Sequence, residues 1–501
     1  MSVHRDRRPR VLLVAATILL AATFALPNPA TADVRLPSVI GSNMVLQRDA
    51  ELPIWGWAEP GEVVVVAFSG QQAKATAGDD GRWSVRLKPV KAGGPHELVV
   101  EGTNRIALEN ILVGEVWVCS GQSNMQWSVR QSANPDEEIA AARFPGIRLF
   151  HVPRRFTTEP EDDVDAQWTE CNPEKVEGFS AVAYYFGRKL HQELDVPVGL
   201  IHTSWGGTRI EPWTPPAGLM LNRETVQILQ RTIEAVDRWK QAKAAAEATG
   251  QESPKHPLEH NQAPTALYNG MVHALVPFAI RGALWYQGES NRGEGMLYFQ
   301  KMQALVGGWR KTWDQGEFPF LFVQLAPWRY PGDNPEALPE IWEAQLAALR
   351  GIPNTGMAVT TDIGNLADIH PKNKQDVGLR LALWALAKTY GHEDVEYSGP
   401  LYKSMAVEDG KARVQFEHAA GLKSRDGQSL SWFKVAGSDG KFVDAQATIE
   451  GETVVVWSDE VEEPKAVRFG WHQEAEPNLV NGAGLPASPF RTDAPRAPGD
   501  T

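Results

Sequence analysis

Apolar and polar positions follow three successive patterns along this chain. Between residues 33 and 110, short runs with alternating apolar residues are separated by turns rich in Gly and Pro, which predicts a small β-sandwich. After Gly114, apolar strands alternate with helical segments, as in a parallel sheet covered by helices on both faces. From about residue 399 the pattern is again that of β-strands. We therefore expect an α/β fold with β-sandwich-like regions at both ends.

The pattern also predicts individual elements. The N-terminal strands are expected at 52–57, 62–68, 83–87 and 96–101, and the C-terminal strands at 412–417, 429–435, 453–457 and 466–471. The central strands are expected at 116–119, 198–203, 280–286, 319–325 and 357–361, with helices at 181–194, 296–313, 339–350 and 376–390. The segment 223–262, charged and helical and then polar, is expected to be a surface insertion or a cap. The predicted domains are 33–110, 111–398 and 399–501.

The first 32 residues have the layout of a secretory signal peptide. Arginines precede an apolar run over residues 11–26, and small residues end at Ala32, where cleavage is expected. The alternative is a retained membrane anchor, but the run is short for one and Pro27 and Pro29 follow it. We expect a secreted or periplasmic protein; the Arg7-Arg8 pair leaves open whether export uses the general or the twin-arginine route.

Charge and composition limit the function classes. The 501-residue chain has a net charge of −13, and its first 32 residues carry four Arg and one Asp, so their removal leaves −16. An acidic surface repels phosphate backbones, which argues against a nucleic-acid partner. No later segment is apolar enough to span a membrane. The two cysteines, Cys119 and Cys171, could pair after export but form no disulfide framework and no zinc site. The 18 tryptophans mildly favour a carbohydrate ligand.

Four polar loops follow predicted strands. They read G-Q-S-N-M at 121–125, S-W-G-G-T at 204–208, W-Y-Q-G-E-S-N at 285–291 and D-I-H-P at 368–371. Ligands of parallel sheets bind beyond the carboxyl ends of the strands. A serine on a sharp turn, a histidine as its base, paired glycines that expose an N–H and a glutamine amide are the parts of a hydrolase site. Singly each loop is an ordinary turn; together they predict Ser123, Gly207, Gln287 and His370 as such a site.

These four motifs, in this order and at this spacing across residues 114–390, resemble the sialate O-acetylesterase family. Its members are serine esterases of the SGNH (GDSL) type with a flavodoxin-like α/β/α core. The resemblance implies that Ser123 is the nucleophile and His370 the base. It also implies an oxyanion hole built from the N–H of Ser123, the N–H of Gly207 and the side chain of Gln287, with no metal or organic cofactor.

The chain departs from the wider SGNH pattern in two places. An Asn usually supplies the third oxyanion donor, whereas Gln287 stands there, with Asn291 as the alternative. The acid usually lies three residues before the histidine, where this chain has Ala367. Asp368, two residues before His370, is then the expected orienting acid, with Asp362 or a backbone carbonyl as alternatives.

The expected activity is that of a carboxylic ester hydrolase that removes O-acetyl groups from sugars, sialate first among them. Acetylated xylan or another carbohydrate ester is the alternative substrate, and a carbohydrate-binding protein with an idle esterase core is the alternative function. An acetylated carbohydrate is the expected partner, and the oligomeric state stays open. The candidates for holding the sugar or bracing the site are Trp127, Trp205, Arg209, Trp213, Glu289 and Asn291.

Overall fold

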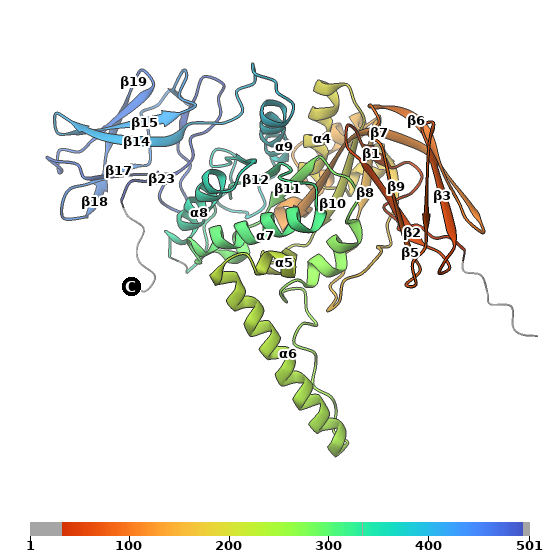
Figure 1. Ribbon diagram of the computed structural model, residues 1–501. Helices are drawn as coiled ribbons and strands as arrows, with labels where there is room; N and C mark the ends of the chain where they lie inside the picture. Colours follow the sequence, from red (N-terminus) through yellow and green to blue (C-terminus); the bar gives the residue numbers. More distant parts are fainter. Residues whose placement is uncertain (1–32, 333, 494–501) are drawn as a thin grey trace, which may run out of the picture.

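The computed structural model describes residues 33–332 and 334–493 of the chain. A central α/β unit lies between an N-terminal β region and a C-terminal β region, and one long helix projects away from the body (Figure 1). The predicted signal peptide, residues 1–32, lies outside the described residues.

The central sheet explains where the polar loops meet. Its strand order is β13-β12-β11-β7-β10-β8-β9, and each neighbouring pair is parallel except β8 with β9. The strands are β7 (Arg105–Gly121), β8 (Phe144–His151), β9 (Trp168–Cys171), β10 (Val198–Ser204), β11 (Gly282–Tyr286), β12 (Phe320–Val323) and β13 (Thr355–Ala358). The apolar side chains of β7, β10 and β11 are buried on both faces, as expected for central parallel strands.

Helices cover both faces of this sheet. The long helices of the core are α4 (Ala181–Leu194), α7 (Leu297–Trp313), α8 (Ala337–Gly351) and α9 (Lys374–Trp384). The helices α4 and α9 pack together on one face, and α7 and α8 lie side by side on the other (Figure 1). The predicted α/β/α layering is confirmed.

Two strands of the central sheet, β8 and β9, were not predicted from the sequence. The apolar pattern of β8 is interrupted by Pro145-Gly146 and by Arg148, which reads as an exposed position. In the structure Arg148 is buried, and its guanidinium donates to the backbone carbonyl and side chain of Asn110 at 3.3 and 3.2 Å. The antiparallel strand β9 is short and half exposed, so its pattern is weak.

The strand β7 belongs to two sheets. Its first half pairs antiparallel with β6 (Gly93–Glu101) and parallel with β1 (Val45–Gln47), and its second half pairs with β10 and β11. Pairing with β6 and β1 ends at Val113 and Gly114, and pairing with β10 begins at Glu115. The boundary expected between residues 110 and 111 therefore falls within one continuous strand.

Both flanking regions are built from antiparallel strands. In the N-terminal region β2 (Leu52–Trp57) pairs with β5 (Arg82–Leu87), and β3 (Val63–Phe68) pairs with β4 (Gln71–Thr76) and β6. The C-terminal region has two four-stranded sheets with its own apolar core. Its strands are β14 (Leu401–Glu408), β15 (Lys411–Glu417), β16 (Lys423–Ser424), β17 (Phe433–Ala436), β18 (Phe442–Asp444), β19 (Gln446–Glu450), β20 (Thr453–Trp457), β21 (Ala466–Phe469), β22 (Leu479–Val480) and β23 (Phe490–Arg491).

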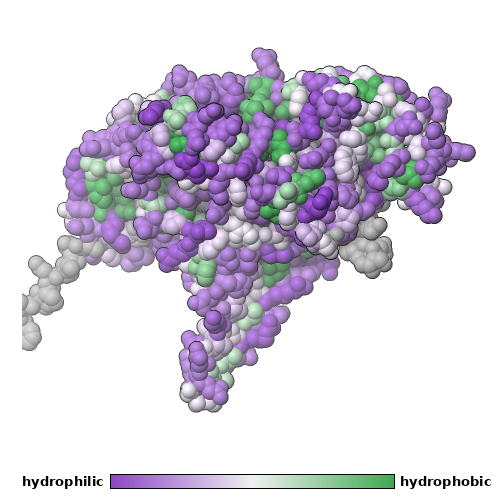
Figure 2. Space-filling model, turned by 180° about the vertical axis from the view of Figure 1, so that it is seen from behind, coloured by the Kyte–Doolittle hydropathy of each residue, from purple (hydrophilic) through white to green (hydrophobic). Residues whose placement is uncertain are grey.

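The projecting helix is α6 (Arg223–Thr249), which begins the segment expected to be an insertion. The Asn222 side chain caps its start by accepting the N–H of Thr225, and Gly250 ends it with a φ of 67°. At 1.5 Å per residue the helix is about 40 Å long. Most of its side chains are exposed, and the rear view shows a largely hydrophilic surface over it (Figure 2). We call α6 and its return segment, residues 251–262, the arm.

Short helical segments connect the larger elements. They are α1 (Ser123–Gln126), α2 (Pro135–Ala141), α3 (Pro173–Glu177) and α5 (Pro216–Leu219), with η1 (Val129–Gln131), η2 (Glu211–Trp213), η3 (Tyr268–Val272), η4 (His273–Leu275), η5 (Glu289–Asn291) and η6 (Ala385–Thr389). In the part of the chain that the structure describes, no helix is both long and apolar enough to cross a membrane. Cys119 and Cys171 are both free and buried, so the disulfide left open by the sequence is not formed.

Candidate active site

Ser123 lies on a tight turn at the end of β7. Gly121 has a φ of 139°, and a Cβ at this position would overlap the carbonyl oxygen of Tyr286 on the neighbouring strand. The N–H of Gln122 donates to that same oxygen at 2.9 Å. The turn is therefore fixed against β11, and it leaves Ser123 as the partly exposed first residue of α1.

The loop after β10 lies directly beside Ser123. A Cβ built on Gly206 would be 3.2 Å from the Cβ of Ser123. The N–H of Gly206 donates to Oε1 of Gln126 at 2.7 Å, whereas Gly207 is exposed with a φ of 73°. Within the described residues the N–H groups of Ser123 and Gly207 donate no hydrogen bond. These two N–H groups are the ones expected to face an oxyanion, and they are available to do so.

His370 follows a strand that is not adjacent to the strand that leads to Ser123. Its loop follows β13, which is separated from β7 by β12 and β11. The loop crosses back, because the Asn124 side chain donates to the Ile369 carbonyl at 3.1 Å and the Ala133 N–H donates to the Lys372 carbonyl at 2.8 Å. The imidazole stacks on Trp127, with ring centroids 4.5 Å apart and an interplanar angle of 10°.

The loops of His370 and Ser123 are hydrogen-bonded to each other through Asn124 and Ile369, but the two side chains are not. Within the described residues no hydrogen bond joins Ser123 Oγ to His370. Catalytic hydrogen bonds of this kind often tighten only when substrate is bound. The arrangement brings nucleophile and base together and leaves both free to react.

Of the two acids considered, only Asp368 contacts the histidine. Its Oδ1 lies 3.5 Å from Nδ1 of His370 and accepts the backbone N–H of His370 at 2.9 Å. Asp362 instead forms a two-pronged ion pair with Arg380, with both N–O distances at 2.6 Å. Asp362 therefore ties its loop to α9 through Arg380, whereas Asp368 is positioned to orient the imidazole.

The charges around His370 suit a base. Burial lowers the pKa of His370 below its ordinary value, the positive charge of Lys374 lowers it further, and Asp368 acts in the opposite direction. A lowered pKa keeps the imidazole neutral, and so able to accept a proton, at neutral pH.

Asn124 joins the two halves of the site, a role that was not predicted. Its Nδ2 donates to Glu289 Oε1 at 2.7 Å and to the Ile369 carbonyl, and its Oδ1 accepts from Lys374 Nζ at 2.6 Å. Burial lowers the pKa of Lys374 to about 7. The run P-K-N-K-Q that holds Lys374 reads as an exposed helix start, so nothing in the sequence signals this burial. Glu289, expected to brace the site, does contact Asn124.

Gln287 has contacts different from those its expected role requires. The side chain is fully buried, and its Nε2 donates to the Thr208 carbonyl at 3.1 Å and to Asn291 Oδ1 at 2.8 Å. Its Oε1 accepts from the Tyr298 hydroxyl at 2.9 Å. Both N–H groups are therefore occupied, and Gln287 can donate to an oxyanion only after breaking one of these bonds. Asn291, the alternative, is occupied too, since its Nδ2 donates to two carboxylates.

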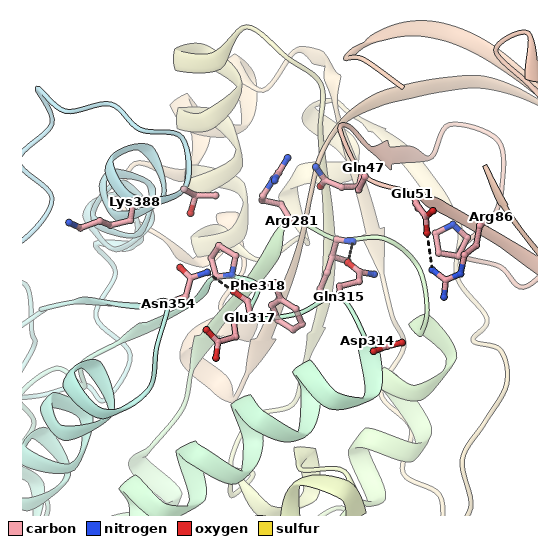
Figure 3. Close-up of a pocket in the computed structure, with 15 residues that line it drawn as sticks. Gln47, Glu51, Arg86, Arg281, Asp314, Gln315, Glu317, Phe318, Asn354 and Lys388 are labelled. Carbon is pink, nitrogen blue, oxygen red and sulfur yellow. Dashed lines mark hydrogen bonds and ion pairs between the residues drawn. The ribbon is translucent and has the colours of Figure 1, made fainter. Parts of the chain in front are cut away.

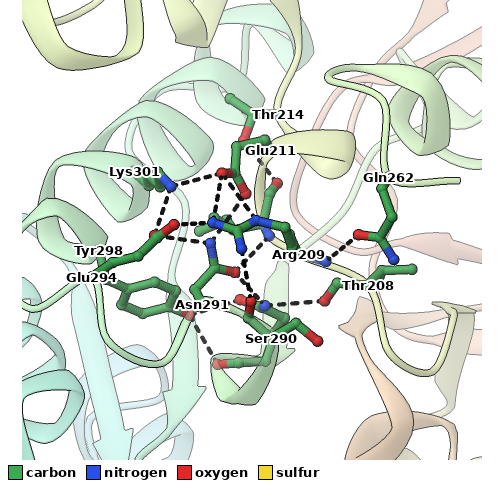
Figure 4. A network of polar contacts seen from close by, with 12 residues as sticks. Thr208, Arg209, Glu211, Thr214, Gln262, Ser290, Asn291, Glu294, Tyr298 and Lys301 are labelled. Atoms are coloured by element: carbon green, nitrogen blue, oxygen red, sulfur yellow. Dashed lines mark hydrogen bonds and ion pairs between the residues drawn. The ribbon is translucent and has the colours of Figure 1, made fainter. Parts of the chain in front are cut away.

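Arg209 belongs to a network of ion pairs behind the site (Figure 4). Its guanidinium contacts Glu211 and Glu294, and Lys301 Nζ lies 2.6 Å from each of the same two carboxylates. We call this set, completed by Asn291, the Arg209 network. The arginine expected to hold substrate thus has its charge neutralised by neighbouring carboxylates.

The three candidate tryptophans differ in position. Trp127 stacks on His370 and Trp205 is partly exposed beside Gly206, so both lie at the site. Trp213 is fully buried, packs edge-on against Trp285 and donates its indole N–H to Thr208 Oγ1 at 3.0 Å. Trp213 is a core residue and cannot contact a sugar.

One cavity of about 540 Å³ lies at the opposite edge of the sheet (Figure 3). Arg281, Phe318 and Asn354 line it at the amino ends of β11, β12 and β13, away from Ser123. Among the described residues no group of three or more His, Cys, Asp or Glu side chains could hold a metal ion.

The family model for the carbohydrate esterases described as sialic acid-specific acetylesterases matches this chain over residues 113–253 and 237–386. The chain belongs to this family. Family membership confirms the resemblance of the four motifs and makes the chain a carboxylic ester hydrolase that acts on carbohydrates, not a binding protein with an idle core. The matched residues include Ser123, Gly207, Gln287 and His370.

Individual relatives agree with this assignment. Sialate O-acetylesterase of Rattus norvegicus is 34% identical over 74% of this chain and 77% of its own length. The Homo sapiens enzyme of the same name is 34% identical over 73% of each chain. The crystal structure of a carbohydrate acetylesterase from Xanthomonas citri is 37% identical and superposes with a TM-score of 0.82, covering 92% of this chain and all of that chain.

Proposed function

We propose that this enzyme removes O-acetyl groups from sugars, with Ser123 as nucleophile and His370 as general base. One observation carries the proposal: the loops of Ser123, Gly207 and His370 contact one another, the N–H groups of Ser123 and Gly207 donate no hydrogen bond among the described residues, and the imidazole stacks on Trp127, four residues after Ser123. An acyl carbonyl placed there meets a nucleophile, a base and two oxyanion donors at once.

The reaction proceeds in two halves. Ser123 Oγ attacks the acetyl carbonyl carbon while His370 takes its proton, and the oxyanion forms beside the N–H groups of Ser123 and Gly207. The bond to the sugar oxygen breaks as His370 returns the proton to that oxygen. A water molecule then gives a proton to His370 as its oxygen attacks the acetyl carbon. The bond between that carbon and Ser123 Oγ breaks, His370 returns the proton to Oγ, and acetic acid leaves. Asp368 holds the imidazole and stabilises its protonated form.

The test compares wild type and Ser123→Ala on p-nitrophenyl acetate, on O-acetylated sialic acid and on acetylxylan. We expect turnover by wild type and only background with Ser123→Ala, since the proposed reaction passes through acylation of Ser123 Oγ. Turnover that survives in Ser123→Ala contradicts the proposal. The preferred sugar follows from the panel: the mammalian relatives are named for sialate, whereas the bacterial relative is named only a carbohydrate acetylesterase.

We also propose that the enzyme is exported and begins at Asp33 after cleavage. The arginines, the apolar run and the small residues at the start of the chain support this. N-terminal sequencing of the exported protein tests it, and a product that retains residues 11–26 contradicts it.

A further inference from the structure

A second cavity of about 660 Å³ lies between the arm and the loop that follows β8. We call it the arm groove. Phe156 and Trp239 line it, together with His256 and the acidic residues Glu159, Glu161 and Glu259. None of these residues takes part in the acyl transfer described above.

The arm groove continues the row of loops that holds the active site. Ser123 follows β7, Trp205 follows β10 and Phe156 follows β8, and these three strands are adjacent in that order. Neighbouring strands lie about 4.8 Å apart, which puts β8 roughly 10 Å from β7. The ring of Trp205 bridges this distance, because it lies beside Gly206 and its centroid is 6.2 Å from that of Phe156. Aromatic rings thus connect Ser123 to the arm groove.

The loop wall of the arm groove is held in place by buried groups. The Asn269 side chain donates to the Thr158 carbonyl at 3.1 Å, and the Glu161 N–H donates to the Asn269 carbonyl at 3.0 Å. Gly270 lets the loop approach, because a Cβ there would overlap the carbonyl oxygen of Arg155.

The arm wall is held as firmly. The indole N–H of Trp239 donates to the Pro254 carbonyl at 2.8 Å, and its ring lies edge-on to His256 at 4.4 Å. Gln262, at the end of the arm, donates to the Gly207 carbonyl at 2.9 Å. It also accepts the Arg209 N–H at 3.1 Å (Figure 4). The arm is therefore tied to the oxyanion loop, and the arm groove exists before any ligand enters.

The chemistry of the lining selects a ligand. Half-buried aromatic rings offer apolar faces, while threonine hydroxyls and carboxylates can bond sugar hydroxyls. Three carboxylates and no Lys or Arg line the cavity. Two cations lie next to it, because Arg155 pairs with Glu161 at 2.8 Å and Lys243 Nζ lies 5.3 Å from the centroid of the Trp239 ring, so the charge around the groove stays negative. An anionic sugar would be repelled there, and an uncharged one would not.

We propose that the arm groove binds sugar residues of an uncharged acetylated glycan whose ester lies at Ser123. The inference rests on the proposed function and names its substrate class. The arm is then a specificity element, and a single acetylated sugar or a small ester leaves it empty.

The experiment measures kcat/KM for Trp239→Ala on acetylated xylo-oligosaccharides and on p-nitrophenyl acetate. We expect about a tenfold loss on the oligosaccharides, the size of effect that a lost aromatic contact produces, and no change on the small ester. Trp432→Ala, which removes a 38% exposed tryptophan from the C-terminal β region, is the matched control and should change neither value. Trp239→Phe should recover most of the loss, which separates a lost contact from a misfolded arm.

Equal losses on both substrates, or no loss on the oligosaccharides, overturn the inference. A second outcome also overturns it. In that outcome wild type has a higher kcat/KM on acetylated sialyl-oligosaccharides than on uncharged ones, and the Glu159→Gln, Glu259→Gln double variant leaves this ratio unchanged. Calorimetry of deacetylated xylo-oligosaccharides with Ser123→Ala separates the two proposals. If the oligosaccharide binds and Trp239→Ala weakens that binding, the arm groove is supported even where the enzyme hydrolyses no ester. If the oligosaccharide does not bind although wild type hydrolyses esters, the arm-groove proposal is overturned and the proposed function stands.

Discussion

Two groups of polar side chains lie at the carboxyl edge of the central sheet, and they differ in how far their hydrogen-bonding capacity is used. In the Arg209 network each charged group faces an opposite charge, and Lys301 is only 5% exposed. At the active site the N–H groups of Ser123 and Gly207 have no partner among the described residues, and His370 keeps one ring nitrogen free of Asp368. Fully paired groups hold the loops, and unpaired groups are left for the substrate.

The largest expected effect breaks the active-site side of this comparison. Asp368→Asn removes the charge that orients and stabilises His370, so kcat on p-nitrophenyl acetate should fall by about 10²- to 10⁴-fold with the melting temperature nearly unchanged. Asp362→Asn is the matched control. It weakens the ion pair with Arg380 and should lower stability while kcat stays within a few fold. The reverse outcome would assign the acid's role to Asp362.

A large effect on stability should come from the Arg209 network. Lys301→Met leaves Glu211 and Glu294 with less positive charge in a buried place, which costs about 3–5 kcal/mol. Denaturant unfolding measures this loss, and kcat of the folded fraction should be retained. Lys189→Met, which breaks an exposed pair with Glu193 one turn along α4, should cost only about 0.3–0.5 kcal/mol. Similar losses for both variants would show that the network does not stabilise the fold as its burial indicates.

Gln287 bonds to Asn291 of the Arg209 network and is also the expected third oxyanion donor. The Gln287→Ala variant tests whether its side chain serves stability or catalysis. Gln287→Ala leaves the buried Thr208 carbonyl without its donor, at about 1–3 kcal/mol for a buried group left unpaired. Asn291 Oδ1 loses one of its two donors and keeps the Ile210 N–H, and the Tyr298 hydroxyl keeps its bond to the backbone carbonyl of residue 287. We expect a clear drop in melting temperature along with a loss of rate. A strong loss of kcat at an unchanged melting temperature would instead support the oxyanion role that the motif implies.

The smallest expected effect is a shift of the pH profile. His370 must be neutral to act as a base, so kcat/KM rises with pH through its pKa, which burial and Lys374 hold below the ordinary value. Lys374→Met removes a positive charge that lowers this pKa. The acidic limb of the profile should therefore move to higher pH, whereas Asp368→Asn should move it to lower pH. An acidic limb that stays in place in Lys374→Met would exclude this electrostatic coupling.

The layers and the motifs could be predicted from the sequence because both depend on residues that are consecutive or nearly so. Buried parallel strands need continuous apolar runs, and a serine turn next to the Tyr286 backbone needs Gly121, so these features show in consecutive residues. The strand β8 was missed since its buried Arg148 reads as an exposed position until Asn110 is folded against it.

The sequence by itself determined the fold class, the family, and the loops on which Ser123, Gly207 and His370 lie. Only the tertiary structure decided which groups are free. Asp368 and Asp362 are both aspartates that precede His370 in the sequence. The structure distinguishes them, because Asp362 pairs with Arg380 and Asp368 contacts His370. Lys374 and Asn124 are hydrogen-bonded although 250 residues separate them, and Trp239 shares a cavity with Phe156, whose loop follows β8. Such contacts depend on how distant segments pack, and no local pattern records them.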